Sequence, residues 1–107
     1  MQRVTVVRYT TKPGRADENE KLSRAVFAEL KGKPRQPFAY AVLRDGDDFL
    51  HLFLNLEQDD ASALTEMESF KAFSADGAAR WTAPPEVIRT GMQLVESYGF
   101  QAALAPA

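Results

Sequence analysis

The sequence predicts a single α+β domain in which the elements follow the order strand, helix, strand, strand, helix, strand. Three observations lead to this prediction. Strand-forming residues occupy both ends of the chain, two segments carry apolar residues at helical spacing, and a central segment has the pattern of a β-hairpin. The length of 107 residues suits one domain that covers residues 1–107.

The composition excludes several classes of protein. Without Cys the chain cannot form disulfides, thiolate zinc sites or iron–sulfur clusters, and a single His excludes a His-rich metal site. The chain has 13 Lys and Arg against 15 Asp and Glu, which argues against a nucleic-acid-binding protein. Its longest largely apolar stretch, residues 49–56, is too short to cross a membrane, and residues 1–9 do not resemble a signal peptide. We therefore expect a cytoplasmic protein with neither nucleic acid nor membrane as a partner.

The first two elements are a strand and a helix. Residues 3–11 are rich in Val, Thr and Tyr and predict a strand that ends at Lys12-Pro13-Gly14. Residues 15–31 predict a helix with acidic residues near its start and an end at Gly32 and Pro34. The mainly apolar stripe of this helix consists of Leu22, Ala25, Val26, Glu29 and Leu30.

Residues 37–57 predict a hairpin around the turn Asp45-Gly46-Asp47-Asp48, because Asp-Gly is a strong hairpin signal. A two- or four-residue loop places on one face Phe38, Tyr40, Val42, Arg44, Phe49, His51, Phe53 and Asn55. The other face then carries Ala39, Ala41, Leu43, Leu50, Leu52, Leu54 and Leu56. Neither face is polar throughout, so we expect both faces to be covered.

The second half of the chain predicts a helix and a final strand. The acidic run Glu57, Asp59 and Asp60 is interpreted as a solvated connector rather than a cation site, because it lacks calcium-loop spacing. Thr65 and Glu68 match a capping box for a helix that continues to about Arg80. The stripe of this helix includes a glycine at which we expect the helix to bend or thin, and it consists of Met67, Phe70, Phe73, Gly77 and Trp81.

Residues 87–100 predict the last strand, and residues 101–107 are either a frayed end or an arm that contacts a partner. The complete order β-α-β-β-α-β is that of the ferredoxin-like fold, a four-stranded antiparallel sheet with both helices on one face. Two helices cover only one face, whereas the hairpin predicts two covered faces. The simplest solution is a second copy packed sheet against sheet, so we expect a homodimeric α+β barrel.

The chain resembles the dimeric α+β barrel superfamily, specifically its antibiotic-biosynthesis-monooxygenase-like group. The resemblance rests on residues 8–14 at the end of the first strand, on residues 17–30 of the first helix, and on the hairpin through His51 and Phe53. It extends to residues 70–73, Arg80, Pro84-Pro85 and residues 95–100. The resemblance implies a homodimer with a pocket between the sheet and the helices of each subunit. It also implies activities such as the cofactor-independent oxidation of polycyclic phenols and quinols, although some members have no catalytic role.

The motifs of the known enzymes in this group are not matched. Haem-degrading members use an Asn on the first strand and a His on the second helix, and neither is present here. Quinol oxygenases pair an Asn with a closely following Trp, whereas this chain has Asn55 and its only Trp is Trp81.

His51 is the side chain best suited to acid–base chemistry near neutral pH. It is a candidate catalytic base, or a hydrogen-bond donor to a phenol or to dioxygen. The alternative is a partly buried strand His held by a neighbouring polar group, and the pattern leaves open which face His51 occupies. Trp81 either stacks on an aromatic ligand or completes the core stripe, in which Phe70 and Phe73 are interpreted mainly as core. The candidate pocket residues are Tyr40, Phe53, Asn55, Phe70, Arg80 and Trp81.

These features support two hypotheses of function. In the first, the protein binds a small aromatic or quinol-type metabolite and oxidises it without a metal or other cofactor. His51 then takes or shares the phenol proton, and Asn55 or Tyr40 holds the oxygen atom. In the second, the protein is a non-catalytic homodimeric binding or scaffold module with a vestigial pocket. A cavity between helices and sheet distinguishes them, because catalysis has no site if side chains fill this space.

Overall fold

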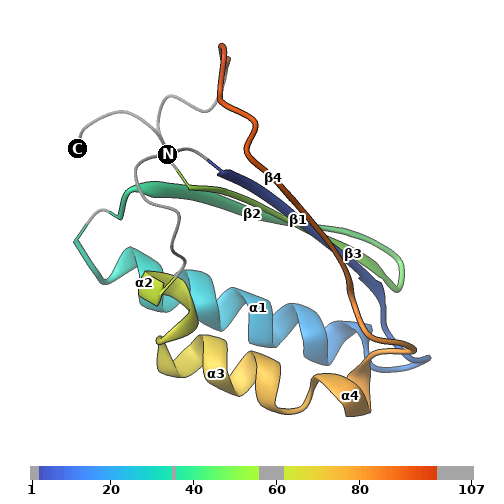
Figure 1. The fold of residues 1–107 in the computed structure, drawn as a ribbon. Helices are drawn as coiled ribbons and strands as arrows, with labels where there is room; N and C mark the ends of the chain where they lie inside the picture. Colours follow the sequence, from blue (N-terminus) through green and yellow to red (C-terminus); the bar gives the residue numbers. More distant parts are fainter. Residues whose placement is uncertain (1–2, 35, 56–61, 99–107) are drawn as a thin grey trace.

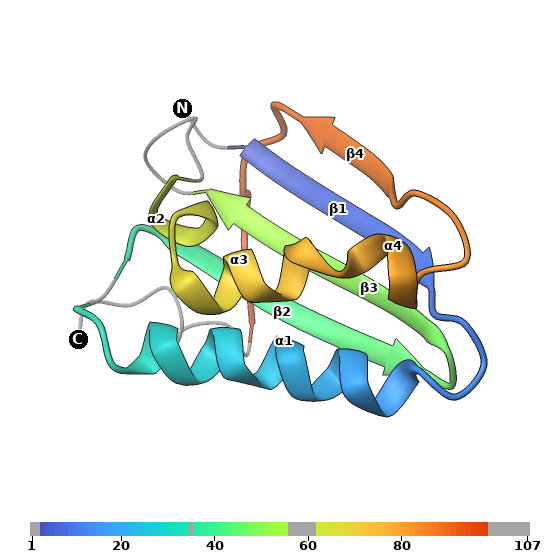
Figure 2. The same ribbon diagram turned by 90° about the horizontal axis from the view of Figure 1, so that it is seen from below.

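The computed structural model describes residues 3–34, 36–55 and 62–98. Its elements are, in chain order, β1 (Arg3–Thr10), α1 (Ala16–Lys31), β2 (Phe38–Asp45), β3 (Asp48–Asn55), α2 (Ser62–Thr65), α3 (Glu68–Ala75), α4 (Gly77–Arg80) and β4 (Glu86–Thr90). The strands form one sheet in the order β2-β3-β1-β4, with every neighbouring pair antiparallel. The helices lie on one face of this sheet, with α1 and α3 side by side (Figures 1 and 2). The ferredoxin-like α+β fold predicted from the sequence is confirmed.

The central hairpin has the predicted register. Asp45 lies opposite Asp48, so the loop contains only Gly46 and Asp47, and Gly46 adopts the positive φ of 62° that such a turn requires. Phe38 lies opposite Asn55, and the two predicted faces follow from this register. The face that carries His51 is the one turned toward the helices.

The first helix begins one residue later than predicted, at Ala16, and its buried stripe is rotated. The buried residues are Ala16, Asn19, Ser23 and Val26, whereas Ala25 is exposed and Leu22 and Leu30 are partly buried. The prediction of Ala25 as a core residue was therefore wrong. The reason is that the helix buries two polar residues, Asn19 and Ser23, which an apolar pattern cannot reveal.

The predicted second helix is broken into α2, α3 and α4. Thr65 ends α2 and does not cap α3, so the predicted capping box was wrong. The start of α3 is held by Glu29 of α1, whose Oε1 accepts hydrogen bonds from Ser69 N at 3.0 Å and Ser69 Oγ at 2.6 Å. A bend or thinning was predicted at Gly77, and the structure has an interruption beside it, since α3 ends at Ala75 and α4 starts at Gly77. A Cβ at position 77 would overlap the ring of Trp81, so this glycine allows the close approach of that ring.

The last strand is much shorter than the predicted span of 87–100, because β4 covers only Glu86–Thr90. The register places Thr90 opposite Val4, so beyond this point little of β1 remains to pair with the chain. Residues 91–98 instead leave the sheet on the side opposite the helices (Figure 1). The acidic run Glu57, Asp59 and Asp60, Leu56 and the segment 101–107 lie outside the described residues.

The face of the sheet opposite the helices is apolar. Its residues alternate along each strand with the helix-facing ones, and they include Val4, Val6, Ala41, Leu50, Leu52, Leu54 and Ile88. Large apolar side chains on this face and in segment 91–98 are exposed, among them Leu43, Ile88, Met92, Val95 and Tyr98. In the part of the chain that the structure describes, no helix is both long and apolar enough to span a membrane.

Candidate functional site

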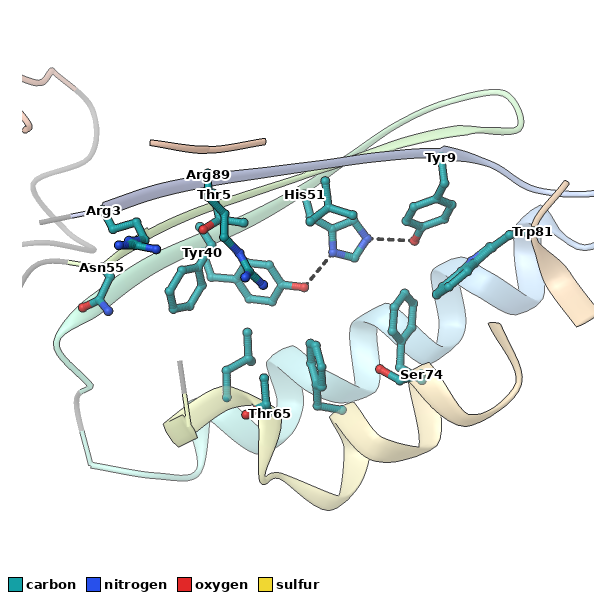
Figure 3. A pocket seen from close by; sticks show the side chains of 15 residues that line it. Arg3, Thr5, Tyr9, Tyr40, His51, Asn55, Thr65, Ser74, Trp81 and Arg89 are labelled. Carbon is teal, nitrogen blue, oxygen red and sulfur yellow. Dashed lines mark hydrogen bonds between the residues drawn. The ribbon is translucent and has the colours of Figure 1, made fainter. Parts of the chain in front are cut away.

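A cavity of about 360 Å³ lies between the sheet and the second helical region. Its walls are largely aromatic and include Phe53, Phe70, Phe73 and Trp81. Tyr9, Tyr40 and His51 supply polar atoms in the middle of the cavity, and Arg3, Thr5, Asn55 and Arg89 gather at one end (Figure 3). The space between the helices and the sheet is therefore hollow, as the hypothesis of a ligand site requires.

His51 lies between two tyrosines. Its Nε2 atom is 2.7 Å from the Tyr9 hydroxyl and its Nδ1 atom is 2.8 Å from the Tyr40 hydroxyl (Figure 3). The three residues come from β1, β3 and β2, and they share the helix-facing side of the sheet. His51 is 6% exposed, and its ring lies 5.5 Å from that of Phe73. The structure therefore agrees with the interpretation of His51 as a buried strand histidine held by polar neighbours, and the ring also lines the cavity.

Asn19 determines the direction of these hydrogen bonds. Its Oδ1 atom accepts bonds from Arg80 Nε at 3.0 Å and Trp81 Nε1 at 3.1 Å, and both of these nitrogens are donors only. The amide orientation is therefore set, and Asn19 Nδ2 donates to the Tyr9 hydroxyl oxygen at 2.8 Å. Asn19 is fully buried and reaches this position from the buried stripe of α1.

The donor and acceptor roles fixed at Asn19 extend to the hydrogen bonds of His51. Tyr9 accepts from Asn19, and the acceptor available to its own hydrogen among the described residues is His51 Nε2. Because a neutral imidazole carries one N–H, the proton then resides on Nδ1, which donates to the Tyr40 oxygen. Tyr40 keeps its own O–H hydrogen for another acceptor.

The pKa values indicate that the hydrogen-bonded side chains of Tyr9, His51 and Tyr40 are uncharged near pH 7. Burial lowers the pKa of His51 from 6.5 to about 4, so the ring is uncharged at neutral pH. Burial also raises the pKa of Tyr9 to about 12, although the hydrogen bond from Asn19 and the charge of Arg80 act in the opposite direction. The pKa of Tyr40 is raised well above its usual range, first by burial and then by Tyr9. All three side chains are therefore protonated neutral groups near pH 7.

Arg80 provides a buried positive charge behind the aromatic wall. It is 0% exposed, and its Nη2 donates to the Phe73 carbonyl at 2.5 Å. Its guanidinium lies over the rings of Phe73 and Trp81, at 5.0 and 5.5 Å from their centroids. Burial lowers the pKa of Arg80, but an arginine remains charged at any physiological pH. Burying a cation costs several kcal/mol, and the hydrogen bonds and aromatic contacts of Arg80 offset part of this cost.

The structure brings most of the predicted site residues together. His51, Tyr40, Phe53, Asn55, Phe70 and Trp81 all line the cavity. Arg80 does not line it and instead contacts Asn19 behind the wall. Sequence reasoning missed Asn19, although its spacing from Leu22 and Val26 places it on the buried stripe, and a polar residue on such a stripe is a usable signal.

No protein-family model matches the sequence, and no curated protein matches it. Solved structures do match the fold. A candidate antibiotic biosynthesis monooxygenase from Nitrosomonas europaea has a TM-score of 0.73 and 15% identity, over 90% of this chain and 94% of that one. A second such candidate, from Caulobacter crescentus, has a TM-score of 0.72 and 18% identity, over 87% of this chain and 91% of that one.

A third structure, a protein of unknown function from Nitrosomonas europaea, has a TM-score of 0.71 and 16% identity, over 91% and 94% of the two chains. At these sequence identities the comparison establishes only the fold, and any argument about function must come from the residues of the site. The chain therefore has the fold of the dimeric α+β barrel group, which it shares with proteins named as antibiotic biosynthesis monooxygenases and with proteins of unknown function.

Proposed function

We propose that the cavity binds a small phenol or quinol and that the protein oxidises this ligand with dioxygen, without a cofactor. The observation that carries this proposal is the Tyr9–His51–Tyr40 chain, which ends in an aromatic-walled cavity of about 360 Å³. Apolar walls with a few convergent polar groups are typical of sites for small aromatic ligands. Some solved proteins with this fold are named as antibiotic biosynthesis monooxygenases, which supports an oxygenase reaction.

In this proposal Tyr40 contacts the ligand oxygen. Its own oxygen accepts the bond from His51 Nδ1, and its hydrogen is available to the phenol or phenolate oxygen of the ligand. A donor fixed where negative charge develops stabilises that charge in a site with little water. Tyr40 thereby favours the electron-rich ionised ligand, which is the form that reacts with dioxygen.

The reaction requires no external reductant. In a phenol with a ring-flanking CH2 group, this group reacts with one O2, one oxygen atom becomes the new carbonyl oxygen, and the other leaves as water with the two hydrogens. A hydroquinone instead gives two electrons and two protons to O2, which forms the quinone and hydrogen peroxide. The ligand supplies all the electrons for this step. The protein contributes the orientation of the ligand, exclusion of water by the aromatic wall, and the hydrogen bond of Tyr40.

The geometry changes the role expected of His51. Its Nε2 lone pair already accepts from Tyr9, and burial lowers its pKa to about 4, so it is a poor base at neutral pH. We assign it the task of holding Tyr40. The same observation favours a second candidate function, a binding module without turnover, because the described lining residues offer a hydrogen-bond donor to the ligand but no side chain suited to accept its proton near pH 7.

Oxygen uptake distinguishes these functions. The wild-type protein is mixed with a panel of hydroquinones and of polycyclic phenols with an activated CH2 group, and O2 consumption is followed with an electrode. We expect Tyr40→Phe and His51→Ala to lower the rate at least about tenfold. Tyr98→Phe is the matched control, because Tyr98 does not line the cavity and Phe keeps the aromatic ring for the proposed dimer contact.

Each outcome has a defined meaning. Saturable binding without O2 consumption supports the non-catalytic module and contradicts the oxygenase. Uptake that is equal in wild type, Tyr40→Phe and Tyr98→Phe removes Tyr40 from the reaction. Absence of both binding and uptake across the panel contradicts the proposal as a whole.

The homodimer predicted from the sequence belongs to this proposal. The apolar sheet face opposite the helices and the exposed side chains of Met92, Val95 and Tyr98 support a second copy as the partner that covers them. Residues 92–98 border a hollow on this face together with Val4, Leu52 and Leu54, which supports their role as part of the same interface.

A further inference from the structure

A buried cation, an amide, two phenols and an imidazole form one continuous chain of hydrogen bonds. It runs from Arg80 through Asn19, Tyr9 and His51 to Tyr40, with separations of 3.0, 2.8, 2.7 and 2.8 Å. With Tyr9 as the donor to His51 Nε2, every bond in it points the same way, with the hydrogen on the side nearer Arg80. Aligned hydrogen bonds polarise one another, and a cation at the donor end strengthens this effect.

We propose that this chain makes Tyr40 a permanent hydrogen-bond donor to the cavity, so that the site binds the deprotonated form of a phenol in preference to the neutral form. Asn19 and Arg80 act as positioning residues, because they reach the ligand only through the chain. The inference rests on the proposed function for the class of ligand, and it adds the charge state that the site selects.

The surroundings of the cavity support an anionic ligand. The charged side chains that line it are Arg3 and Arg89, and none of its described lining residues is Asp or Glu. The other titratable groups that face the ligand are Tyr9, Tyr40 and His51, and these three are neutral near pH 7. Behind them, Glu18, Asp76 and Arg15 act on Arg80 only through longer-range electrostatics.

Asn19→Asp should reverse the direction of the hydrogen bonds between residue 19 and Tyr40. The carboxylate keeps the acceptor that Arg80 and Trp81 require, but it can no longer donate to Tyr9. Tyr9 must then donate to residue 19, His51 must donate from Nε2, and the Tyr40 hydrogen must turn toward His51 Nδ1. The cavity would then meet a lone pair of Tyr40, which suits a neutral phenol that donates its own hydrogen.

The first arm of the test is the tautomer of His51 in the ligand-free protein. Because the chain has one His, long-range ¹⁵N–¹H spectra of ¹⁵N-labelled protein at pH 8 report this ring alone. We expect protonated Nδ1 in the wild type and protonated Nε2 in Asn19→Asp. A wild-type ring protonated on Nε2 overturns the proposal, and this measurement stands even if the variant does not fold. An unchanged tautomer in a folded Asn19→Asp protein overturns the positioning role of Asn19.

The second arm uses 4-nitrophenol, whose neutral and ionised forms differ in absorbance. We expect the wild type to bind the phenolate at least about tenfold more tightly than the phenol, and Asn19→Asp to reduce this ratio by a similar factor. The new negative charge also acts directly, so the same comparison is made in the Tyr40→Phe background, where the orientation effect must disappear. A ratio near one in the wild type, or an equal effect of Asn19→Asp with and without the Tyr40 hydroxyl, overturns the proposal.

The two arms separate this inference from the proposed function. Phenol binding with no preference for the phenolate contradicts the inference and leaves the ligand class intact. Absence of any nitrophenol binding contradicts the ligand arm and weakens the proposed function, while the tautomer in the ligand-free protein still decides whether the chain has the inferred direction.

Discussion

Tyr9 and His51 lie diagonally across neighbouring strands, and the Tyr9 hydroxyl reaches His51 Nε2 at 2.7 Å. The register places Tyr9 opposite Phe49 and His51 opposite Val7, so the two residues share a face with an offset of two positions. A tyrosine is long enough to bridge such a diagonal pair. This contact connects the polar centre of the cavity to the buried Asn19 on α1.

The burial of His51 predicts a pH dependence of stability. The unfolded chain binds a proton at His51 below about pH 6.5, whereas the folded protein does so only near its lowered pKa of about 4. Stability is therefore lost as the pH falls through this window. Between pH 7 and pH 5 we expect the free energy of unfolding to fall by about 2 kcal/mol.

Urea denaturation at several pH values and one protein concentration measures this loss. His51→Gln is the control, because it should remove most of the dependence of the free energy of unfolding on pH above pH 5. Glu18, Glu20 and Glu29 have pKa values below their usual 4.5, so they contribute only at lower pH. An equal slope in wild type and His51→Gln would contradict the neutral buried histidine.

The contact of Glu29 with Ser69 predicts a second effect on stability. The Glu29 carboxylate accepts from both the backbone N and the Oγ of Ser69, and so it caps α3 from a neighbouring helix. Glu29→Ala should lower the melting temperature by several degrees in calorimetry, and Ser69→Ala should lower it less because the backbone bond remains. If Ser69→Ala costs more than Glu29→Ala, the capping role is wrong.

Gly77 should not tolerate a side chain. Gly77→Ala places a methyl group on the Trp81 ring, and overpacking of this kind costs about 1–3 kcal/mol, more than the gain of about 1 kcal/mol that Ala brings to a helix. Urea denaturation should show the loss and Trp81 fluorescence should shift. Gly91→Ala is the matched control, since nothing lies within 4 Å of a Cβ there. Equal stability of the two variants would contradict the close packing of Trp81.

The apolar outer face predicts a dimer. Light scattering should give the wild type twice the mass of the 11.9 kDa chain. Leu52 lies on the third strand between Val6 and Ala41, so Leu52→Glu places a charge in the middle of this face and should yield the single-chain mass. Lys21→Glu, on the exposed side of α1, should leave the dimer unchanged. A wild type with the single-chain mass would contradict the second copy.

The hairpin and its faces could be predicted because alternation and an Asp-Gly turn determine register locally. Phe38, Tyr40, His51 and Phe53 were placed on one face in this way, and the structure bears this out. Which face met the helices was not predictable, because both faces are largely apolar.

The rest of the site depends on contacts distant in sequence. Asn19 and Trp81 meet across 62 positions, and Glu29 caps a helix 40 positions away. The predicted capping box of Thr65 failed for the same reason, since a tertiary partner took its place. Local patterns do not carry such information. A polar residue on a buried helical stripe is the one sign that pointed to the chain of hydrogen bonds.

The central claim is that a phenol oxygen meets the Tyr40 hydroxyl in the cavity, and Trp81 fluorescence tests it most directly. Trp81 is the only Trp and lines the cavity, so a bound aromatic ligand should change its emission. We predict saturable quenching of the wild type by phenols and quinols but weaker binding of anisole, which cannot ionise. Tyr40→Phe should bind phenols at least about fivefold less tightly, and Tyr98→Phe should bind like the wild type. Equal affinity of phenol for wild type and Tyr40→Phe, or no saturable quenching by any phenol or quinol, would contradict the account.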